Sequence, residues 1–529
     1  MIYTLDKMKQ EIKSKIGINE IEFNVPKDRN FGDLTTNIAM KMAKQEKKNP
    51  RIIAEEILKK VSDLDFLDKV EIAGAGFINF YFAEDFYKNI LNDAINSEYP
   101  TLDIGNGKSV NIEYVSANPT GPMHMGNARG GAVGDSLSRI YKKAGYNVVK
   151  EFYLNDAGNQ IEKLKASLYA RYMQIENPDY PFPEDGYQGE DVADLVKKYI
   201  TENSNPEGDE DEIKEKLADF ALTNNVAEMK RILGNYNISY DVWYHESDLY
   251  KNKLVENVLA VLAEKGATYE QDGAVWLKCE GKDEVLRRAN GIPTYFAADI
   301  AYHYNKFIER KFDKAINVWG ADHHGHIARM KNAMANFGVD PDNLEIVLIQ
   351  LVRLMRDGEV AKMSKRTGKT ISLGDLVEEI GVDPARFFFN MRSPSTHFDF
   401  DLDLATKKSS DNPVYYVQYA HARINSILEQ VGKYTTGIYT ELNEEEKELL
   451  SYLAKLPQEI KIIIDTSDPS RLTHYCIELS RLFHSFYAKH KVLVDDNDTK
   501  NTRLSIIFAV KKTLRACLEL LGVSAPDKM

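Results

Sequence analysis

Residues 109–135 read SVNIEYVSANPTGPMHMGNARGGAVGD, and this stretch decides the fold. Its first seven residues alternate between apolar and polar side chains as in a β-strand, whereas the residues from Gly130 onward have the apolar spacing of a helix. Glycines, prolines and a single histidine, His124, separate the two runs. A strand that enters a helix through such a turn is typical of a parallel sheet, in which ligands bind beyond the carboxyl ends of the strands.

The same order of strand and helix recurs along the chain on both sides of an insertion. Apolar strands separated by helices predict an α/β fold, in which a parallel sheet carries helices on both faces. We assign this Rossmann-like domain to residues 106–405 and its insertion to about residues 170–290, where prolines interrupt acidic, solvated segments. The further runs that we interpret as strands are 147–154, 314–320 and 344–352, and those that we interpret as helices are 158–173 and 326–338.

The regions that flank the parallel sheet have other patterns. Residues 1–105 combine helical stretches with the short alternating run GFINFYF, which predicts a small α+β domain. In residues 406–529 the strand signals fade and long amphipathic segments follow one another, which predicts an all-α bundle of four or more helices. One of these segments, residues 471–491, is basic and aromatic, and both a solvated helix face and an RNA-facing surface stay open for it.

The composition is that of a soluble globular protein, because 43% of the 529 residues are apolar and 28% are charged. No run approaches the ~18 consecutive apolar residues that span a bilayer, and the charged start of the chain is unlike a targeting segment. We therefore expect a cytoplasmic protein that does not contact membranes. The net charge of −13 disfavours non-specific coating of nucleic acid but leaves room for a local basic face. Three cysteines without metal or redox spacing predict reduced, structural thiols.

The turn within residues 109–135 has the chemistry of a phosphate site. Glycines at 121, 126, 130 and 131 leave room for a ligand against the backbone, and the helix that follows offers unpaired N–H groups and the positive end of its dipole. His124 adds a donor for charge that develops on a phosphate. Taken alone, a glycine-rich turn that only serves packing explains the same residues.

A second segment, RLMRDGEVAKMSKRTGKTISL at residues 353–373, strengthens the phosphate interpretation. The pair Asp357–Gly358 between two extended runs predicts a hairpin. The loop beyond it places lysines, an arginine and hydroxyl groups together, as a clamp on polyphosphate does. A solvated basic loop is the alternative.

Together the two segments carry a resemblance to a known family. HMGN at 124–127 resembles the His-x-Gly-His element of class I aminoacyl-tRNA synthetases, with Asn127 in place of the second histidine, and KMSKR at 362–366 matches their second signature. The resemblance implies that His124, Lys362 and Lys365 are catalytic. It also implies an ATP-binding set consisting of Gly121, His124, Gly126, Asn127, Lys362, Met363, Ser364 and Lys365.

Further blocks are similar to the arginyl-tRNA synthetases within that class, over nearly the whole chain. These blocks are EYVSANPTGPMHMGNARG at 113–130, DVWYHES at 241–247, YVQYAHARI at 416–424 and RNFGDLTTNIAMKMAK at 29–44. In this family the first domain contacts the tRNA elbow and the helical domain binds the anticodon. The resemblance thus implies a tRNA-contacting domain at 1–105, a catalytic domain at 106–405 and an anticodon-binding domain at 406–529.

An arginine substrate agrees with the residues themselves. A guanidinium group is planar and always charged, so a selective pocket offers carboxylates for forked hydrogen bonds and an aromatic face. The segment YFAADIAYH places Tyr295 and Asp299 four residues apart, on one helical face, although an ordinary amphipathic helix has the same spacing. By resemblance these two residues and Glu113 bind the guanidinium. Ser116, Asn118 and His323 match the residues that hold the amino and carboxylate ends of the amino acid.

The implied reaction joins L-arginine to ATP, with Mg²⁺ on the phosphates, and passes the activated arginine to the 3′-terminal adenosine of tRNA(Arg). The implied tRNA contacts are Tyr415, Tyr419, Arg471 and Arg481, and we expect a monomer. The histidines of GADHHGH at 320–326 lack a partner cluster, so no structural zinc is expected. Two alternatives remain: a synthetase-like tRNA-binding regulator without catalysis, and a small-ligand adenylating enzyme, which usually lacks the long helical domain.

Overall fold

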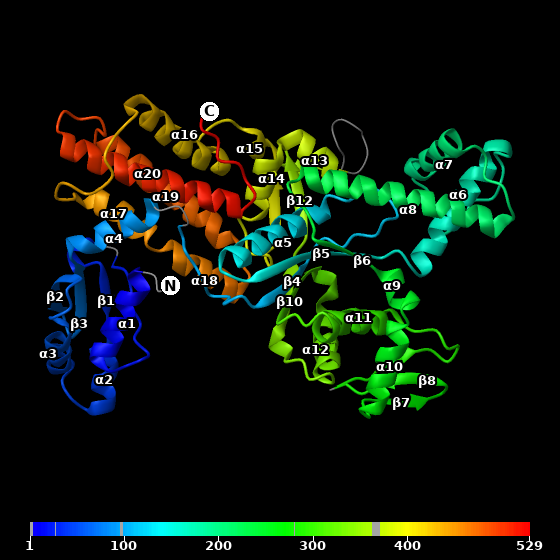
Figure 1. Cartoon of the computed structure of the whole chain (residues 1–529), viewed down its shortest axis with the longest axis horizontal. Coiled ribbons are helices and arrows are strands. Elements are labelled where there is room, and N and C mark those ends of the chain that lie inside the picture. The colour runs from blue at the N-terminus through cyan, green and yellow to red at the C-terminus, as the bar shows by residue number, and fades with distance from the viewer. Residues whose placement is uncertain (1–3, 27, 96–98, 280, 362–370) are drawn as a thin grey trace.

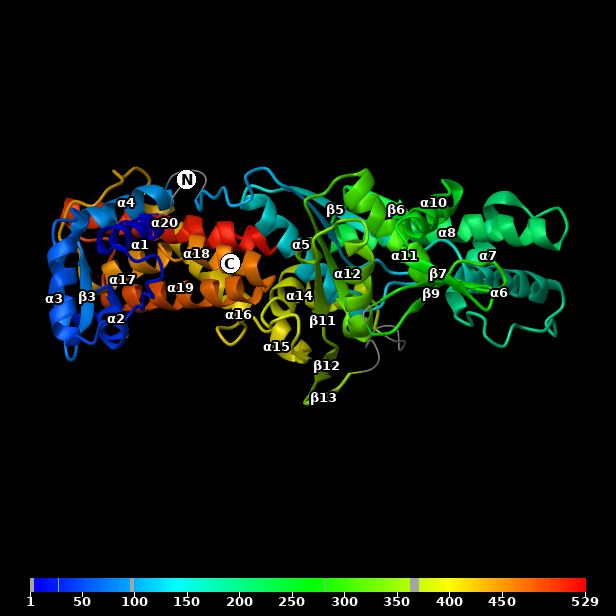
Figure 2. The same ribbon diagram turned by 90° about the horizontal axis from the view of Figure 1, so that it is seen from below.

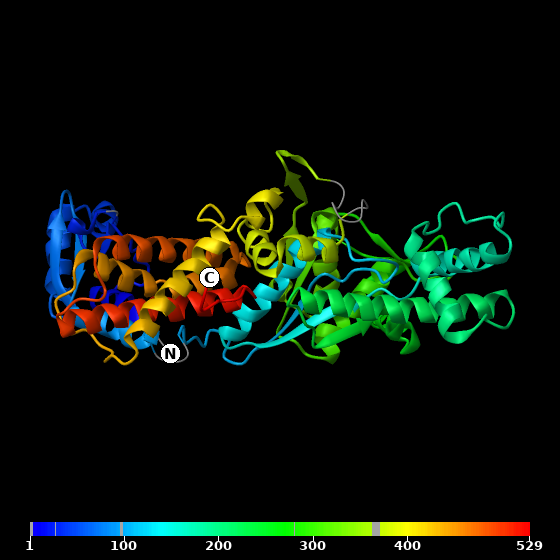
Figure 3. The same cartoon turned by 90° about the horizontal axis from the view of Figure 1, so that it is seen from above.

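The computed structural model of the chain describes residues 4–26, 28–95, 99–279, 281–361 and 371–529. The molecule is elongated (Figures 1 and 3). A small N-terminal domain lies at one end beside the C-terminal helices, a parallel sheet occupies the centre, and the helices of the insertion form the other end (Figure 2).

The centre of the molecule is a parallel sheet with the strand order β11-β10-β4-β5-β6. The strands beside β4 come from different parts of the chain: β5 follows it at once, whereas β10 follows the insertion. The strand order therefore reverses at β4, which is where open α/β sheets bind ligands. This confirms the predicted sheet. Its strands are β4 (Ser109–Glu113), β5 (Asn147–Leu154), β6 (Val242–His245), β10 (Lys314–Gly320) and β11 (Leu344–Ile349).

Strand β4 is buried on both faces, because helices cover both sides of the sheet. On one face α5 approaches closely: a Cβ added to Gly134 of α5 would lie 2.3 Å from the Tyr114 ring, so only glycine fits there. On the other face α11 runs into a π-helical turn, and Lys306 of that turn contacts Glu113 of β4. The helices over the sheet are α5 (Gly126–Lys143), α11 (Tyr295–Tyr304), its π-helical turn (Asn305–Glu309) and α12 (Ile327–Ala335).

The insertion is largely helical. Its acidic segments form α7 and the start of α8, where Asp209 and Glu212 make a reciprocal capping box, and the prolines lie between the helices. Three of its helices enclose a small apolar core of their own. The elements of this region are α6 (Asn159–Glu176), α7 (Glu190–Asn203), α8 (Glu210–Asn235), α9 (Glu246–Lys251), α10 (Leu254–Glu264), β7 (Thr268–Gln271), β8 (Ala274–Leu277) and β9 (Glu284–Arg287).

After the central sheet, the chain forms the predicted hairpin. Asp357 and Gly358 both have positive φ, 51° and 78°, as the tight turn between β12 and β13 requires. The predicted site residues Lys362, Met363, Ser364 and Lys365 lie outside the described residues. The elements here are β12 (Val352–Arg356), β13 (Glu359–Val360), β14 (Phe398–Asp401), α13 (Leu373–Ile380), α14 (Val382–Phe389) and α15 (Leu402–Thr406).

The two ends of the chain form the remaining parts, and both agree with the sequence patterns. The N-terminal part is an antiparallel sheet of order β1-β3-β2 packed on helices. The C-terminal part is an all-α bundle, and α4 packs against its helices α17 and α20. The N-terminal elements are α1 (Thr4–Ile16), β1 (Leu34–Thr36), α2 (Ile38–Glu46), α3 (Pro50–Val61), β2 (Leu67–Ala73), β3 (Phe77–Phe82) and α4 (Glu84–Ile95). The bundle consists of α16 (Pro413–Val431), α17 (Glu444–Leu453), α18 (Leu456–Thr466), α19 (Ser470–Lys489) and α20 (Asn497–Leu520).

Over the described part of the chain, no helix has both the length and the apolar character needed to cross a membrane.

Candidate active site

The turn between β4 and α5 holds His124 at the start of the helix. The backbone N–H of Gly126 donates to His124 Nδ1 at 3.1 Å, so Nδ1 acts as an acceptor and the ring N–H is on Nε2. His124 also forms an isolated antiparallel bridge with Ser372, and the Leu373 N–H donates to the Met123 carbonyl at 3.0 Å. The residues that follow the second signature therefore pair with the first, although the two signatures lie more than two hundred residues apart.

The other side of the same turn holds Glu113 and Ser116 against each other. The Ser116 hydroxyl donates to Glu113 Oε1 at 3.1 Å and accepts from the Tyr153 N–H, also at 3.1 Å. The second carboxylate oxygen of Glu113 accepts from the buried Lys306 ammonium at 2.7 Å. Asn118 is exposed further along the turn. The structure thus brings Glu113 and Ser116 into contact, although they were predicted for different ends of the substrate, and the negative charge of Glu113 is matched by a lysine.

Tyr295 and Asp299 lie in the first turns of α11, as their spacing predicts. Thr294 caps the helix by accepting from the Ala297 N–H, so the helix begins at Tyr295. The Tyr295 side chain is 54% exposed and lines a cavity of about 390 Å³. Asp299 Oδ2 lies 3.1 Å from His326 Nε2.

His323, predicted with Ser116 and Asn118 at the amino and carboxylate ends of the substrate, lies in the 3₁₀ turn after β10. Its imidazole is exposed, packs 5.9 Å from the Trp319 ring and lies 3.6 Å from Asp322 Oδ2. Within the described residues, His326 is the histidine of this 3₁₀ turn that contacts Asp299.

One buried carboxyl group beside Asp299 was not singled out from the sequence. Glu246 begins α9, directly after β6, and is 3% exposed. Burial and the nearby carboxylates of Asp299 and Asp156 raise the pKa of Glu246 to about 7, and a hydrogen bond with Tyr153 partly offsets the rise. Glu246 lies in the block DVWYHES, which is similar to the arginyl-tRNA synthetases. A glutamate that follows a parallel strand at its carboxyl end is a signal that could have marked it.

Charge balance distinguishes the buried Glu246 and the partly exposed Asp299 from two other acids near the site. Glu151 accepts from the Arg310 guanidinium at 2.8 Å, and Glu113 is paired with Lys306. Neither Glu246 nor Asp299 has an ion pair with a lysine or arginine among the residues that the structure describes. Two adjacent carboxyl groups without a fixed cation form an environment that favours a positively charged ligand.

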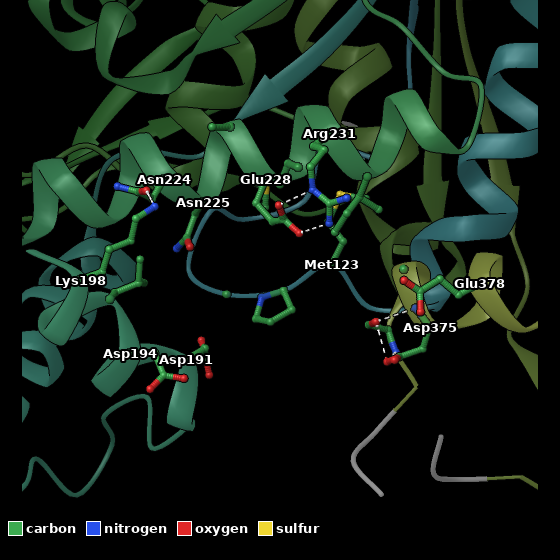
Figure 4. Close-up of a pocket in the computed structure, with 18 residues that line it drawn as sticks. Met123, Asp191, Asp194, Lys198, Asn224, Asn225, Glu228, Arg231, Asp375 and Glu378 are labelled. Carbon is green, nitrogen blue, oxygen red and sulfur yellow. Dashed lines mark hydrogen bonds and ion pairs between the residues drawn. The ribbon is translucent and has the colours of Figure 1, made fainter. Parts of the chain in front are cut away.

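A larger cavity of about 650 Å³ lies beside residues 121–123 of the turn that carries His124 (Figure 4). Gly121 and Met123 of the turn, helices α7 and α8 of the insertion, and the start of α13 line it. Asn225 of α8 donates to the Pro119 carbonyl at 2.8 Å, so the insertion is fastened directly to the turn. A Cβ added to Gly121 would lie 3.4 Å from Asp191 Oδ2 of α7. The predicted ATP contact Gly121 therefore lies where the turn meets the insertion.

The predicted tRNA contacts lie on the helical bundle, in two different surroundings. The Tyr415 and Tyr419 rings of α16 are stacked, with centroids 6.3 Å apart and planes 7° apart. The His484 ring of α19 lies 6.1 Å from the Tyr419 ring, and burial beside the Arg423 guanidinium lowers the pKa of His484 to about 4. These residues form an aromatic surface with a neutral histidine.

The two predicted arginine contacts on α19 are engaged within the bundle. Arg471 Nε donates to Glu459 at 2.7 Å, and the Arg481 guanidinium forms a fork with Glu478 at 2.8 and 2.7 Å. The structure therefore brings the tyrosines together with His484, whereas both arginines already have carboxylate partners. Within the described residues, no group of histidine, cysteine, aspartate and glutamate side chains has the arrangement of a metal site.

An interrupted parallel sheet that carries the first signature at its switch point, with the residues after the second signature paired to it, defines a class I aminoacyl-tRNA synthetase, and the comparisons with known proteins agree. Three family models match the chain: the arginyl tRNA synthetase N terminal domain at residues 4–82, the catalytic domain of class I (R) tRNA synthetases at 88–392, and the DALR anticodon binding domain at 417–529. The chain belongs to the arginyl-tRNA synthetase family, and it is a ligase.

Individual relatives agree with the family models. An arginine–tRNA ligase of Acetivibrio thermocellus is 49% identical over 97% of this chain and 94% of its own length. One from Caldanaerobacter subterraneus is likewise 49% identical, with the same coverage of both chains. The solved structure of Thermus thermophilus arginyl-tRNA synthetase has the same fold, with a TM-score of 0.79 at 21% identity and 99% coverage of both chains.

Proposed function

We propose that this enzyme activates L-arginine with ATP and transfers it to the 3′-terminal adenosine of tRNA(Arg), releasing pyrophosphate and AMP. One observation carries the choice of arginine: two adjacent carboxyl groups, the buried Glu246 and the partly exposed Asp299, have no lysine or arginine partner among the described residues and lie beside the Tyr295 end of α11. The relatives that share nearly the whole chain are arginine–tRNA ligases, which supports the same choice.

In this proposal the guanidinium of the substrate binds between Glu246 and Asp299, with Tyr295 along its face. A guanidinium offers several N–H donors in one plane, so it can satisfy two carboxylates at once. Its charge relieves their mutual repulsion, which favours ionised Glu246 in the complex. Lysine presents a point charge without this fork and leaves a buried carboxylate poorly paired, so selectivity does not require editing.

The other end of the amino acid lies at the turn after β4. The resemblance implies Glu113 as a guanidinium contact; because Lys306 and Ser116 already hold Glu113, we propose instead that it lies at the amino end of the substrate, together with Ser116 and Asn118. His323 is predicted for the same set, and its ring packs near Trp319 and Asp322. Tyr153 connects the two ends of the site, because its N–H binds Ser116 and its hydroxyl binds Glu246.

In the activation step a carboxylate oxygen of arginine attacks the α-phosphorus of ATP in line. The bond from that phosphorus to the bridging oxygen breaks, and pyrophosphate leaves. The Nε2–H of His124 and the positive end of the α5 dipole, at Gly126 and Asn127, stabilise the charge that develops. Lys362 and Lys365 do the same on the pyrophosphate side, supported by the family match. Mg²⁺ arrives with ATP and is held mainly by its phosphates.

In the transfer step a ribose hydroxyl of the terminal adenosine attacks the carbonyl carbon of arginyl-adenylate, and AMP leaves. The aromatic surface of Tyr415, Tyr419 and His484 stacks with anticodon bases, and Arg423 lies over the Tyr419 ring at 5.8 Å. We assign this role to the domain at 406–529, and contact with the tRNA elbow to the domain at 1–105. We further propose that the enzyme is monomeric and works in the cytoplasm.

The test is ATP–pyrophosphate exchange with each amino acid, with and without tRNA. If the proposal holds, arginine is the one amino acid that supports exchange. Exchange with a different amino acid and none with arginine overturns the substrate. The non-catalytic alternative predicts tRNA binding without exchange under any of these conditions.

A further inference from the structure

The most enclosed charge near the amino-acid site belongs to Lys306, whose side chain is 0% exposed. Its ammonium lies 2.7 Å from Glu113 Oε2, 3.0 Å from Asn317 Oδ1 and 4.3 Å from the centre of the Tyr302 ring. An ammonium group has three N–H donors, and two carboxylate or amide oxygens and one aromatic face account for them. Lys306 is therefore held in one position, and its donors are not available to a substrate.

A local change of helix type brings Lys306 to this position. Residues Asn305–Glu309 form a π-helical turn directly after α11, the helix of Tyr295 and Asp299. Such turns insert a residue into the helical repeat and occur frequently at functional sites. Here the turn places Lys306 toward β4 on the helix face that already carries the proposed arginine contacts.

On one side, the hydrogen bonds of Lys306 lead to a strained turn. Val115 and Ser116, which follow β4, have φ of 69° and 42°. Two consecutive residues other than glycine in this region are costly, above all a β-branched valine, and they persist only where their surroundings hold them. Lys306 fixes Glu113, Glu113 accepts from the Ser116 hydroxyl, and the Tyr153 N–H donates to the same hydroxyl oxygen.

On the other side, the chain of hydrogen bonds reaches the backbone of α11. Asn317 accepts from Lys306 through Oδ1, and its Nδ2 lies 2.7 Å from His303 Nε2. His303 Nδ1 lies 2.7 Å from the Asp299 carbonyl oxygen, which can only accept, so the ring proton is on Nδ1 and Nε2 accepts from Asn317. Every donor in this chain meets an acceptor. One lysine thus connects the turn of Ser116 to the helix turn of Asp299.

We propose that Lys306 is a positioning residue for the amino-acid site: it holds the strained turn at Val115–Ser116 in place through Glu113. It does not touch the substrate. Without its charge, the buried Glu113 has no cation to face, the contact with Ser116 weakens and the turn relaxes toward negative φ. The residues that receive the amino end of arginine then lose their arrangement, whereas the ATP-binding start of α5 is unaffected. The inference rests on the proposed arginine site.

The direct test replaces Lys306 in the full-length enzyme and measures ATP–pyrophosphate exchange with saturating tRNA. In Lys306→Met we expect the KM for arginine to rise at least about tenfold, as for the loss of a charged hydrogen bond, while the KM for ATP stays within about twofold. The matched control is Lys314→Met, which removes a lysine of β10 whose partner Glu345 lies outside the site. It should leave both KM values unchanged. Equal rises for arginine and ATP in Lys306→Met indicate general damage and overturn the proposal.

A double-variant cycle tests the path through Ser116. Ser116→Ala removes the far end of the same chain of hydrogen bonds, so the double variant with Lys306→Met should raise the KM for arginine no more than the larger single change. If the two effects multiply, Lys306 does not act through Ser116 and the proposal is wrong.

If Lys306→Met does not fold, the positioning role is tested with Lys306→Arg, which keeps the positive charge but replaces the compact ammonium group. A rise of about fivefold in the KM for arginine with an unchanged KM for ATP supports the proposal, and an unchanged KM for arginine overturns it. Exchange by the unmodified enzyme distinguishes failure of the proposed function from failure of the positioning role alone. If it exchanges with no amino acid, the proposed function fails; if it exchanges with arginine and the variants do not alter the KM for arginine, only the positioning role fails.

Discussion

Two groups of charged side chains lie on opposite sides of the central sheet, and they differ in their balance. On one side of the sheet, Asp135 of α5 is 0% exposed and forms ion pairs with Arg386 at 2.6 Å and with Arg139 at 2.7 Å. On the α11 side, Glu246 and Asp299 are neighbours without a lysine or arginine partner among the described residues.

The balanced group joins separate parts of the molecule. Arg386 also donates to the Leu521 carbonyl at 2.8 Å and the Tyr236 carbonyl at 3.1 Å, so it connects α5 to the C-terminal end of the bundle and to the end of α8. A saturated buried ion pair of this kind specifies how elements fit together. The unbalanced group has no such partner and costs stability until a cation binds. The substrate site is therefore marked less by burial than by the lack of a lysine or arginine beside its two carboxyl groups.

The largest expected effect comes from removing a charge in the unbalanced group. Asp299→Asn should lower kcat/KM for arginine by about a thousandfold, because a charge-assisted fork to the guanidinium is lost, at about 4 kcal/mol. The melting temperature should stay the same or rise slightly, since the repulsion between the two carboxyl groups is relieved. Steady-state exchange kinetics and thermal unfolding measure both. A variant that melts early and keeps its arginine kinetics would make Asp299 a structural residue.

The same change in the balanced group should affect stability instead. Asp135→Asn leaves the fully buried Arg386 without its carboxylate, which typically costs about 3–5 kcal/mol. We expect a melting temperature lower by several degrees, with KM values for arginine and ATP near those of the parent in the protein that stays folded. If the KM for arginine changes and the melting temperature does not, the distinction between the two groups is lost.

The raised pKa of Glu246 predicts a pH dependence that the balanced group lacks. With a pKa of about 7 in the free enzyme, Glu246 is protonated at lower pH and must release a proton to bind a guanidinium. The KM for arginine should therefore rise by up to about tenfold per pH unit below pH 7 and level off above it. Glu246→Gln should remove this dependence, and a pH profile of the KM from 5.5 to about 8.5 tests it.

The same shift affects unfolding with the opposite sign. Because the folded pKa of Glu246 lies above its ordinary value of 4.5, its contribution to stability is present below about pH 4.5 and is lost as pH rises through about 7. Arginine restores that contribution, so the rise in melting temperature on adding saturating arginine should be larger at pH 8 than at pH 6. An equal rise at both values would show that Glu246 does not face the substrate.

The smallest effect is expected for an exposed ion pair. Arg353 forms a fork with Asp399 at 2.8 and 2.9 Å, but both side chains are exposed, so water and salt screen the pair. Arg353→Ala should change the free energy of unfolding by less than about 1 kcal/mol and leave the kinetics unchanged. A loss comparable to that of Asp135→Asn would mean that burial does not separate structural from surface charges here.

Local sequence was sufficient for the framework of the site. The alternation in residues 109–115 and the glycines that follow predict the strand, turn and helix around His124, because these depend on short-range periodicity and on backbone conformation. Asp357–Gly358 predicts its hairpin for the same reason. The four-residue spacing of Tyr295 and Asp299 places both on α11, since a helix repeats every 3.6 residues.

The partners of these residues could not be predicted in this way. Glu246 and Asp299 are separated by more than fifty residues of chain, and their proximity follows from the meeting of α9 and α11. Lys306 looks like an ordinary solvated lysine in the sequence, because no pattern announces a π-helical turn. Arg471, a predicted tRNA contact, is paired with Glu459 of α18, and only packing reveals this pair, whereas Glu478, the partner of Arg481, lies three residues earlier on the same helix.

By itself, then, the sequence determined the parallel sheet, the order of its elements and the two signature segments, because each depends on neighbours within a few turns of chain. The tertiary structure decided which buried charges are balanced: Asp135 meets two arginines, Glu113 meets Lys306, and Glu246 meets another carboxyl group. The physical reason is that electrostatic balance depends on distance and burial, and both are set only when segments far apart in the chain pack against one another.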